Sequence, residues 1–171
     1  EKPPSGGVSV VSESVPLDEE MVASARRLLS AVDFTGVAMV EFKRFVLEAD
    51  MLRDKRGNSV PVVSTINFIS ADSLSGVIQV GSNAYIGRNG VGGITVEGNI
   101  SEYKFSRHER SGSYNISYIL RTPVGTYDVQ ISARTDGRAD ATVRSTTWGN
   151  QLNYTGYLVP LGLSRVFKGM S

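Results

Sequence analysis

The glycine-rich stretch of residues 87–93, Gly-Arg-Asn-Gly-Val-Gly-Gly, is one place where this sequence could do chemistry. Such a loop can point backbone N–H groups at a phosphate when it follows a strand and opens a helix. Here the glycines lead straight into the strand-like stretch 94–97, so the pattern favours a tight β-turn or bulge that uses glycine for positive φ. If the loop binds a ligand, Arg88 and Asn89 at its tip are the predicted contacts.

Aromatic side chains are a second candidate, because seven tyrosines and one tryptophan could offer flat faces for stacking on sugars. Most of them fall on a regular alternation, where core and cross-strand packing is the ordinary role. Trp148 and Tyr154 flank the turn of residues 149–151. We therefore expect these two to be the exposed pair with a ligand-binding role.

The histidine and cysteine content of the chain excludes several kinds of catalytic and metal site. His108 is the only histidine, and we interpret it as a solvated residue of the charged turn 107–110. The chain has no cysteine, which excludes disulfides, thiolate nucleophiles and cysteine-bound zinc. We predict no catalytic residues, no cofactor and no metal site.

Composition indicates one folded domain of ordinary size. The chain has 171 residues, of which 40% are hydrophobic and 20% charged, far from the composition of a disordered protein. The formal net charge is +1, so no strong field attracts nucleic acid, and nucleic acid is not an expected partner. No apolar run reaches the roughly 18 residues of a transmembrane segment.

The first 44 residues predict a strand, a helix and a second strand. Residues 8–15 are rich in β-branched side chains, and residues 37–42 form a short apolar run. Asp18 can cap a helix that extends to residue 33, whose apolar residues recur on one face.

From Phe45 onward the hydrophobic period is two, with turn signals every 8–12 residues or so, as in an all-β domain. The clearest pair is a hairpin in which residues 114–120 and 127–133 alternate around the turn 123–125. The other predicted strands are residues 45–50, 60–69, 76–80, 94–100, 102–107, 139–143 and 152–159.

The predicted fold is therefore mainly β: an antiparallel β-sandwich or partly closed β-barrel with the N-terminal α-helix packed on it. We divide the chain into a strand–helix–strand segment, residues 1–44, and an all-β domain, residues 45–171. The segment is too short to be expected to fold as an independent domain.

Residues 5–44 contain Ser-Gly-Gly-Val near their start and Gly-Val-Ala-Met-Val-Glu-Phe-Lys near their end. They resemble a stretch of the ATP-grasp superfamily, in its carboxylate–amine ligase branch. This resemblance implies that Glu41 helps to hold the magnesium ions of ATP. A single carboxylate does not hold a magnesium triphosphate. A fragment kept for structure is the alternative.

A second set of motifs lies in residues 45–171: Phe45-Val-Leu-Glu-Ala-Asp50, Asp54-Lys-Arg-Gly57, Ile66-Asn67-Phe68, residues 87–98, Ser101-Glu-Tyr-Lys104, Gly156-Tyr-Leu-Val-Pro160 and Ser164-Arg-Val-Phe-Lys-Gly169. With these motifs the segment resembles a different family, the uncharacterised domain-of-unknown-function family 4251 of the Bacteroidetes. The resemblance implies a small, mainly β, secreted or lipid-anchored protein that faces the periplasm or the cell surface, with no assigned catalytic residues.

Two hypotheses on function follow. The first is a non-enzymatic envelope protein that binds a ligand or partner, a glycan or an envelope protein, through loops such as 87–93 and 147–152. The second is a cytoplasmic remnant or accessory fragment of an ATP-dependent carboxylate–amine ligase, in which Glu41 would be a metal ligand.

Overall fold

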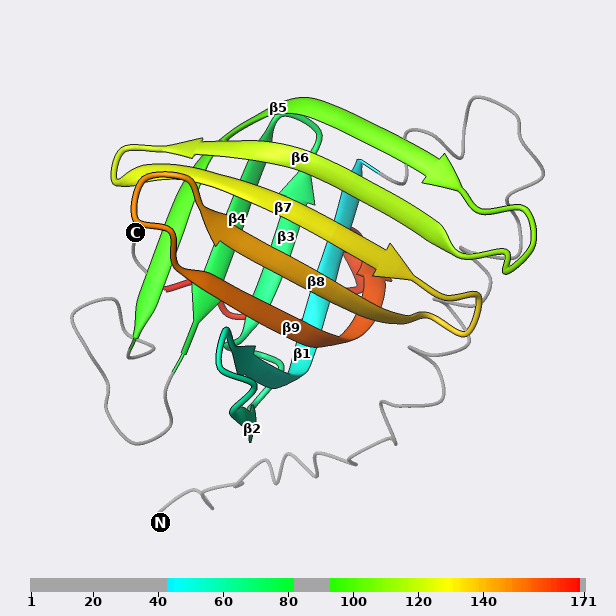
Figure 1. Cartoon of the computed structure of the whole chain (residues 1–171), viewed down its shortest axis with the longest axis horizontal. Coiled ribbons are helices and arrows are strands. Elements are labelled where there is room, and N and C mark those ends of the chain that lie inside the picture. The colour runs from blue at the N-terminus through cyan, green and yellow to red at the C-terminus, as the bar shows by residue number, and fades with distance from the viewer. Residues whose placement is uncertain (1–42, 82–92, 170–171) are drawn as a thin grey trace, which may run out of the picture.

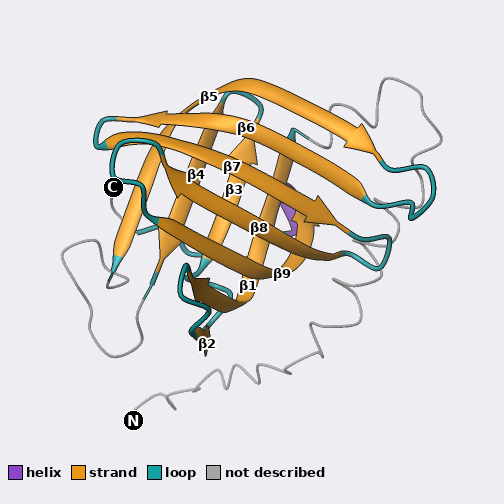
Figure 2. Ribbon diagram, viewed as in Figure 1, coloured by secondary structure: helices purple, strands orange, loops and turns teal. Residues whose placement is uncertain are grey.

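The computed structural model describes residues 43–81 and 93–169, and strands make up most of these ranges (Figure 2). The described elements are β1 (Arg44–Asp54), β2 (Ser59–Pro61), β3 (Phe68–Asp72), β4 (Ser75–Val80), β5 (Ile94–Arg107), β6 (Tyr114–Thr122), β7 (Gly125–Ala133), β8 (Arg138–Ser145), β9 (Gln151–Pro160) and a short 3₁₀ helix, η1 (Leu161–Leu163). No α-helix occurs in these ranges. The predicted helix of residues 18–33 and its flanking strands lie outside them.

Eight of the strands, β1 and β3 to β9, form a closed antiparallel barrel (Figure 1). Each strand pairs with the next one, and β9 returns to pair with β1 from Phe45–Pro160 to Asp54–Leu152. The short strand β2 lies beside the second half of β1, which β3 does not reach. The prediction of a mainly β fold is confirmed, and of its two alternatives the sandwich is wrong and the barrel is fully closed.

Alternate side chains of each strand point into the barrel, as the period of two predicts. On β6 the inward residues Tyr114, Ile116, Tyr118 and Leu120 are all buried. The predicted hairpin is confirmed, because β6 and β7 pair along their whole length up to Thr122 and Gly125.

The single strand predicted for residues 60–69 is wrong. β2 ends at Pro61, and β3 begins only at Phe68. Proline has no N–H to continue the ladder, and the chain turns here instead. The buried Asn67 side chain holds this turn, since its amide donates to the Val63 carbonyl at 2.9 Å.

The two strands predicted within residues 94–107 form one strand, β5. A β-bulge interrupts it, because the register with β6 shifts between Ser101 and Lys104. Within the bulge Tyr103 packs against the core, and its ring stacks on Tyr118 with ring centres 6.2 Å apart.

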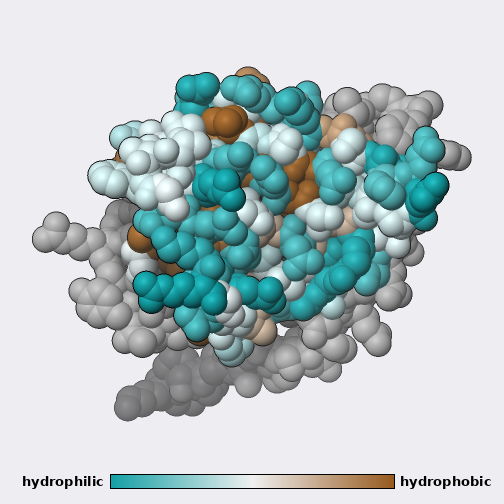
Figure 3. All heavy atoms as spheres, viewed as in Figure 1, coloured by the Kyte–Doolittle hydropathy of each residue, from teal (hydrophilic) through white to brown (hydrophobic). Residues whose placement is uncertain are grey.

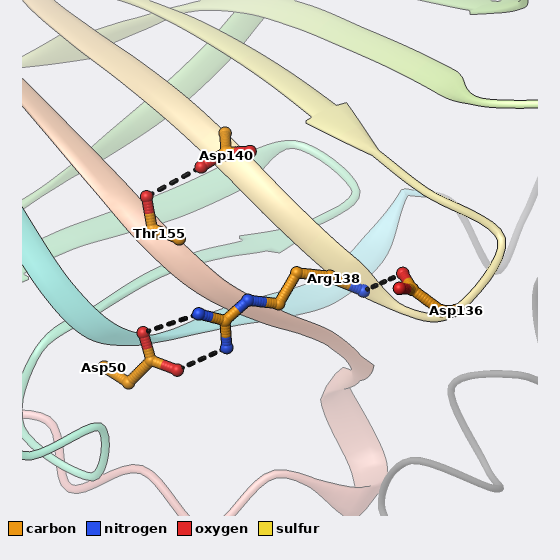
Figure 4. A network of polar contacts seen from close by, with 5 residues as sticks. All are labelled: Asp50, Asp136, Arg138, Asp140 and Thr155. Atoms are coloured by element: carbon orange, nitrogen blue, oxygen red, sulfur yellow. Dashed lines mark hydrogen bonds and ion pairs between the residues drawn. The ribbon is translucent and has the colours of Figure 1, made fainter. Parts of the chain in front are cut away.

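The seam between β9 and β1 is closely packed. A Cβ atom on Gly156 would lie 1.9 Å from the Glu48 carbonyl oxygen, so only glycine allows this approach. On the outside, Arg138 of β8 reaches across β9 to Asp50 of β1 with N–O distances of 2.5 and 3.3 Å (Figure 4). Its guanidinium lies 4.9 Å from the centre of the Tyr157 ring on β9. These contacts tie three strands together at the point of closure.

The C-terminal segment, residues 161–169, packs on the outside of the barrel. It covers an apolar cluster formed by Val46, Phe68, Val77 and Val159. The fully buried Gln79 side chain fixes its end, because the amide donates to the Phe167 carbonyl at 2.8 Å and accepts from the Gly169 N–H at 2.8 Å. The interior of the barrel therefore remains separate from this outer layer.

Candidate functional site

A cavity of about 660 Å³ lies at the end of the barrel where β4 ends, β5 begins and the β6–β7 and β8–β9 turns lie. Small-molecule sites typically measure roughly 300–1,000 Å³, and an eight-stranded barrel is wide enough for one small ligand. Its walls are mainly apolar, and the lining residues are Ile78, Val80, Ile94, Val96, Val124, Tyr127, Val143, Ser145, Trp148, Asn150, Gln151, Leu152 and Tyr154.

The sizes of the inward side chains explain why the cavity lies at this end. Here β4 and β5 contribute only aliphatic residues, and β8 contributes Val143 and Ser145. At the opposite end Phe45, Phe105 and Tyr114 fill the barrel, and the last two rings are stacked with centres 5.8 Å apart. The interior is therefore packed at one end and hollow at the other.

The outer face over β6 to β9 is different in character. Figure 3 shows mostly hydrophilic side chains on this face, with hydrophobic ones visible between them. A second hollow of about 450 Å³ lies there, lined mainly by polar side chains of β6, β7 and β8 such as Ser117, Gln130 and Thr142. The large apolar hollow thus belongs to the inside of the barrel.

Tyr154 lines the cavity, and its position corrects the prediction that it is exposed. Its side chain is completely buried, while Trp148 is 71% exposed. Both nevertheless line the same cavity, with Trp148 at its rim. Their predicted role in ligand binding stays a prediction.

Two buried tyrosine hydroxyls stand out inside the barrel. Neither the hydroxyl of Tyr118 nor that of Tyr154 has a hydrogen-bond partner in the part of the chain that the structure describes. Burial raises the pKa of Tyr118, and the neighbouring phenols of Tyr103 and Tyr154 raise it further. Burial also raises the pKa of Tyr154, with a contribution from Tyr127. The four phenols are thus close enough to influence one another.

The cavity has no charged group among its described lining residues. Ser145, one of its few polar residues, already accepts a hydrogen bond from the Trp148 N–H at 3.1 Å. The Gln151 amide points its oxygen to Arg144 outside the barrel, at 3.1 Å. The other polar residues of the described lining are Asn150, Tyr127 and Tyr154, and the Tyr154 hydroxyl is itself buried.

The other predicted site residues lie elsewhere. Arg88, Asn89 and Glu41 fall outside the described residues. His108 is exposed in the β5–β6 turn, where its Nδ1 atom lies 3.1 Å from the Ser111 hydroxyl. Within residues 43–81 and 93–169, no three His, Cys, Asp or Glu side chains gather as metal ligands do. Nor does any helix of these ranges have the length and apolar character to cross a membrane.

Sequence reasoning missed most of the cavity lining. Val80, Ile94, Val124 and Tyr127 were assigned to strands and turns without a binding role, because each is an ordinary strand or turn residue on its own. The available signal was that the inward residues of β4 and β5 are aliphatic at this end, while Phe45, Phe105 and Tyr114 lie inside the barrel at the other. That signal becomes visible only when the strand order is known.

Comparisons with known proteins bear on the two resemblances. The chain is similar in structure to a DUF4251 family protein from Bacteroides eggerthii, with a TM-score of 0.63 and 29% sequence identity. This similarity covers 89% of the present chain and 95% of the other. A search of curated proteins found no match. Nothing in the comparisons supports the resemblance of residues 5–44 to ATP-grasp ligases.

The match to a family model identifies the family of this chain more directly than the structural similarity does. The model described as "Domain of unknown function (DUF4251)" matches residues 32–158. The match includes β1 to β8 and most of β9, so it contains nearly the whole barrel. The chain belongs to the DUF4251 family.

Proposed function

We propose that this chain is a non-enzymatic protein of the bacterial envelope, facing the periplasm or the cell surface, that binds a small apolar molecule inside its barrel. The observation that carries the proposal is the mainly apolar cavity of about 660 Å³ at one end of the barrel. The location is supported by the family resemblance and by the relative from Bacteroides.

The chemistry of the cavity favours binding over catalysis. Its lining includes the buried phenol of Tyr154, and burial raises the pKa of this group and of its neighbour Tyr118. Both phenols are therefore protonated at neutral pH, where they can donate hydrogen bonds but do not act as general bases. A chemical step would need a base or nucleophile beside the ligand.

An apolar ligand fits better than a glycan. A sugar needs polar partners for its hydroxyl groups, and the walls of the cavity are mainly aliphatic and aromatic. The polar hollow on the outer face of β6 to β8 offers hydroxyl and amide groups, but no aromatic residue is among its described lining. Burial of apolar surface is the main source of affinity that the barrel can supply.

Two matched variants test this proposal. Val124 lies in the β6–β7 turn, lines the cavity and is 62% exposed, so Val124→Asp places a charge at the rim with little effect on folding. Leu74 lies in the β3–β4 turn at the opposite end and is 77% exposed, which makes Leu74→Asp the control. The probe is the neutral apolar dye N-phenyl-1-naphthylamine, titrated by its fluorescence.

We expect the native protein and Leu74→Asp to bind the dye equally well. Val124→Asp should weaken binding about tenfold, which corresponds to 1.4 kcal/mol, because the carboxylate keeps its water beside the apolar ligand. Equal affinity in all three proteins would place the dye elsewhere and contradict the proposed site. Absence of dye binding to the native protein would contradict the function itself.

A further inference from the structure

Three large apolar side chains stand in water around the mouth of the cavity. Ile94 is 64% exposed, and Val124 and Trp148 are exposed to a similar degree. All three line the same cavity, although they come from the start of β5, the β6–β7 turn and the β8–β9 turn (Figure 1). Single exposed apolar residues are common, but several gathered around one opening indicate a surface that meets a partner.

Hydrogen bonds fix the two turns that carry Val124 and Trp148. The Thr126 carbonyl accepts from the Thr146 N–H at 2.9 Å and from the Thr146 hydroxyl at 3.1 Å, which joins the turns to each other. The Ser145 hydroxyl accepts from the Trp148 N–H at 3.1 Å, and the Ser145 carbonyl accepts from the Gly149 N–H at 3.0 Å. The indole is therefore held in water by a well-bonded turn, although burying it would stabilise the fold more.

The charges near the mouth also have a pattern. Residues 93–95, 122–127 and 145–151, which we call the rim, contain no charged residue. Arg121 and Arg144 come directly before the two turns, and both are exposed. Arg121 lies 3.8 Å from Glu102, whereas Arg144 forms no ion pair within the described residues and donates to the Gln151 side chain at 3.1 Å. The rim is thus uncharged and apolar, with an uncompensated cation behind it.

The opposite end of the barrel has a different surface. Its β5–β6 turn contains charges of both signs in residues 107–110, and in its β7–β8 turn Arg134 lies 3.8 Å from Asp136. Leu74 is exposed there, in the β3–β4 turn. Charged turns of this kind keep their water, so the apolar character of the rim is not a general property of the turns of this protein.

We propose that the mouth of the barrel docks on the surface of a lipid bilayer, with Ile94, Val124 and Trp148 at the boundary between head groups and acyl chains. Tryptophan is enriched at that boundary, because one end of its ring is apolar and the other donates a hydrogen bond. Apolar side chains next to a cation are the combination that binds anionic lipid surfaces.

A bilayer fits the rim better than a protein partner does. A stable protein interface has roughly 20–30 residues on each side, and the rim offers three apolar anchors. This inference adds a partner to the proposed function, since an apolar ligand would pass between bilayer and cavity without crossing water. The docking itself rests on the exposed rim and does not require that a ligand binds.

Co-sedimentation with lipid vesicles tests the docking in the native protein. One set of vesicles consists of phosphatidylcholine, and the other contains equal parts of phosphatidylcholine and phosphatidylglycerol. We expect binding to both sets, with higher affinity for the anionic one. Lipid that carries a nitroxide on its acyl chain should broaden the NMR signals of residues 122–126 and 145–150 and leave those of residues 107–113 sharp. Absence of sedimentation with either set, or equal broadening at both ends, overturns the proposal.

Two matched variants test the apolar contact. Val124→Asp should weaken binding to the anionic vesicles about tenfold, because it removes an apolar anchor and adds a charge that the lipid repels. Leu74→Asp at the opposite end is the control and should bind as the native protein does. Equal weakening in both variants contradicts docking through the rim. The nitroxide experiment on the native protein decides the matter even if Val124→Asp does not fold.

Arg144→Gln tests the electrostatic part. It removes one positive charge beside the rim, so affinity for the anionic vesicles should fall about fivefold while affinity for phosphatidylcholine vesicles stays unchanged. Arg110→Gln removes an exposed charge from the opposite end and should change neither affinity. Equal losses in the two variants would mean that the net charge of the protein binds the lipid, which contradicts the proposed orientation.

The vesicle experiments separate this inference from the proposed function, because they use no dye. If N-phenyl-1-naphthylamine binds in the cavity and vesicles do not bind, the proposed function stands and the inference is overturned. If vesicles bind through the rim and the dye does not bind, the inference stands and the proposed function fails.

Discussion

At the scale of single residues, Asp54 shows how one carboxylate organises a turn. It ends β1, and its Oδ1 atom accepts hydrogen bonds from the backbone N–H groups of Arg56 and Asn58 at 2.8 and 2.9 Å. Its Oδ2 atom accepts from the Asn58 side-chain amide at 2.8 Å. Gly57 completes the turn with a φ of +92°, which glycine adopts without strain.

These hydrogen bonds make the contribution of Asp54 to folding stability depend on pH. The side-chain amide of Asn58, followed by the backbone N–H groups, lowers the pKa of Asp54 below its ordinary value of 3.8. The unfolded chain then binds the proton more readily than the folded one. The contribution of Asp54 to stability is present above pH 3.8 and should be lost as the pH falls through the lower, folded pKa. An NMR titration of the Asp54 carboxyl carbon measures that pKa.

The control for this prediction is Asn58→Ala. It removes the side-chain donor and should move the pKa of Asp54 back up toward 3.8, with a flatter loss of stability in acid. A folded-state pKa at or above 3.8 in the native protein would show that the turn does not favour the charged carboxylate.

Tyr154 illustrates what single residues in a sequence leave undecided. In β9 one set of alternate residues contains Leu152, Tyr154 and Leu158, and the other contains Tyr157 and Val159. Both sets are partly apolar, so the alternation alone does not say which one faces inward. The pairing with β1 and β8 decides it, and this information is not local.

At the scale of elements, the closure of the barrel depends on contacts that cross more than one strand. Arg138 on β8 forms a two-point ion pair with Asp50 on β1 and lies over Tyr157 on the strand between them. Exposed ion pairs usually contribute about 0.2–1 kcal/mol. A paired guanidinium held over an aromatic ring adds roughly 0.5–1 kcal/mol.

Arg138→Ala should therefore destabilise the fold by about 1–2 kcal/mol. The matched control is Arg44→Ala, because Arg44 pairs with Asp72 on the adjacent strand β3 at 2.9 Å and both side chains are more than half exposed. The control should cost less than about 0.5 kcal/mol. Urea unfolding measures both, and equal losses would mean that the bridge across β9 contributes no more than an ordinary surface pair.

Sequence patterns predicted most of the strands but not how they end or close. The run of residues 60–69 has high β-propensity, yet Pro61 stops one strand and the turn held by Asn67 delays the next. β-propensity describes how well side chains fit a pleated surface, and it does not predict where the chain must turn. The barrel was predicted to be only partly closed. Neither the sequence of β1 nor that of β9 shows that these two strands pair.

At the scale of the whole molecule, the barrel is dominated by contacts between residues distant in sequence. The first strand, β1, cannot complete its pairing until the last strand, β9, has been made and placed. All-β proteins with such topologies fold in roughly milliseconds to seconds. Closing a long loop costs conformational entropy before the distant strands form the contacts that stabilise them. We expect refolding from urea in that range by stopped-flow circular dichroism. Microsecond refolding would mean that the transition state does not require the β1–β9 pairing.

The candidate site was predicted only in part for the same reason. Trp148 and Tyr154 were singled out from the sequence as aromatic neighbours of one turn, and the structure places both on one cavity. The remaining walls come from β4, β5, β7 and β8, which the sequence separates widely. A cavity lined by single residues from several separate strands has no motif of its own.

The place of Trp148 has a practical consequence. It is the only tryptophan in the chain, and it stands at the rim of the cavity with 71% of its surface in water. Indole emission moves to shorter wavelength when water leaves the ring. If the proposed function holds, the native protein carries its own optical reporter, and candidate ligands can be screened by tryptophan emission without any label.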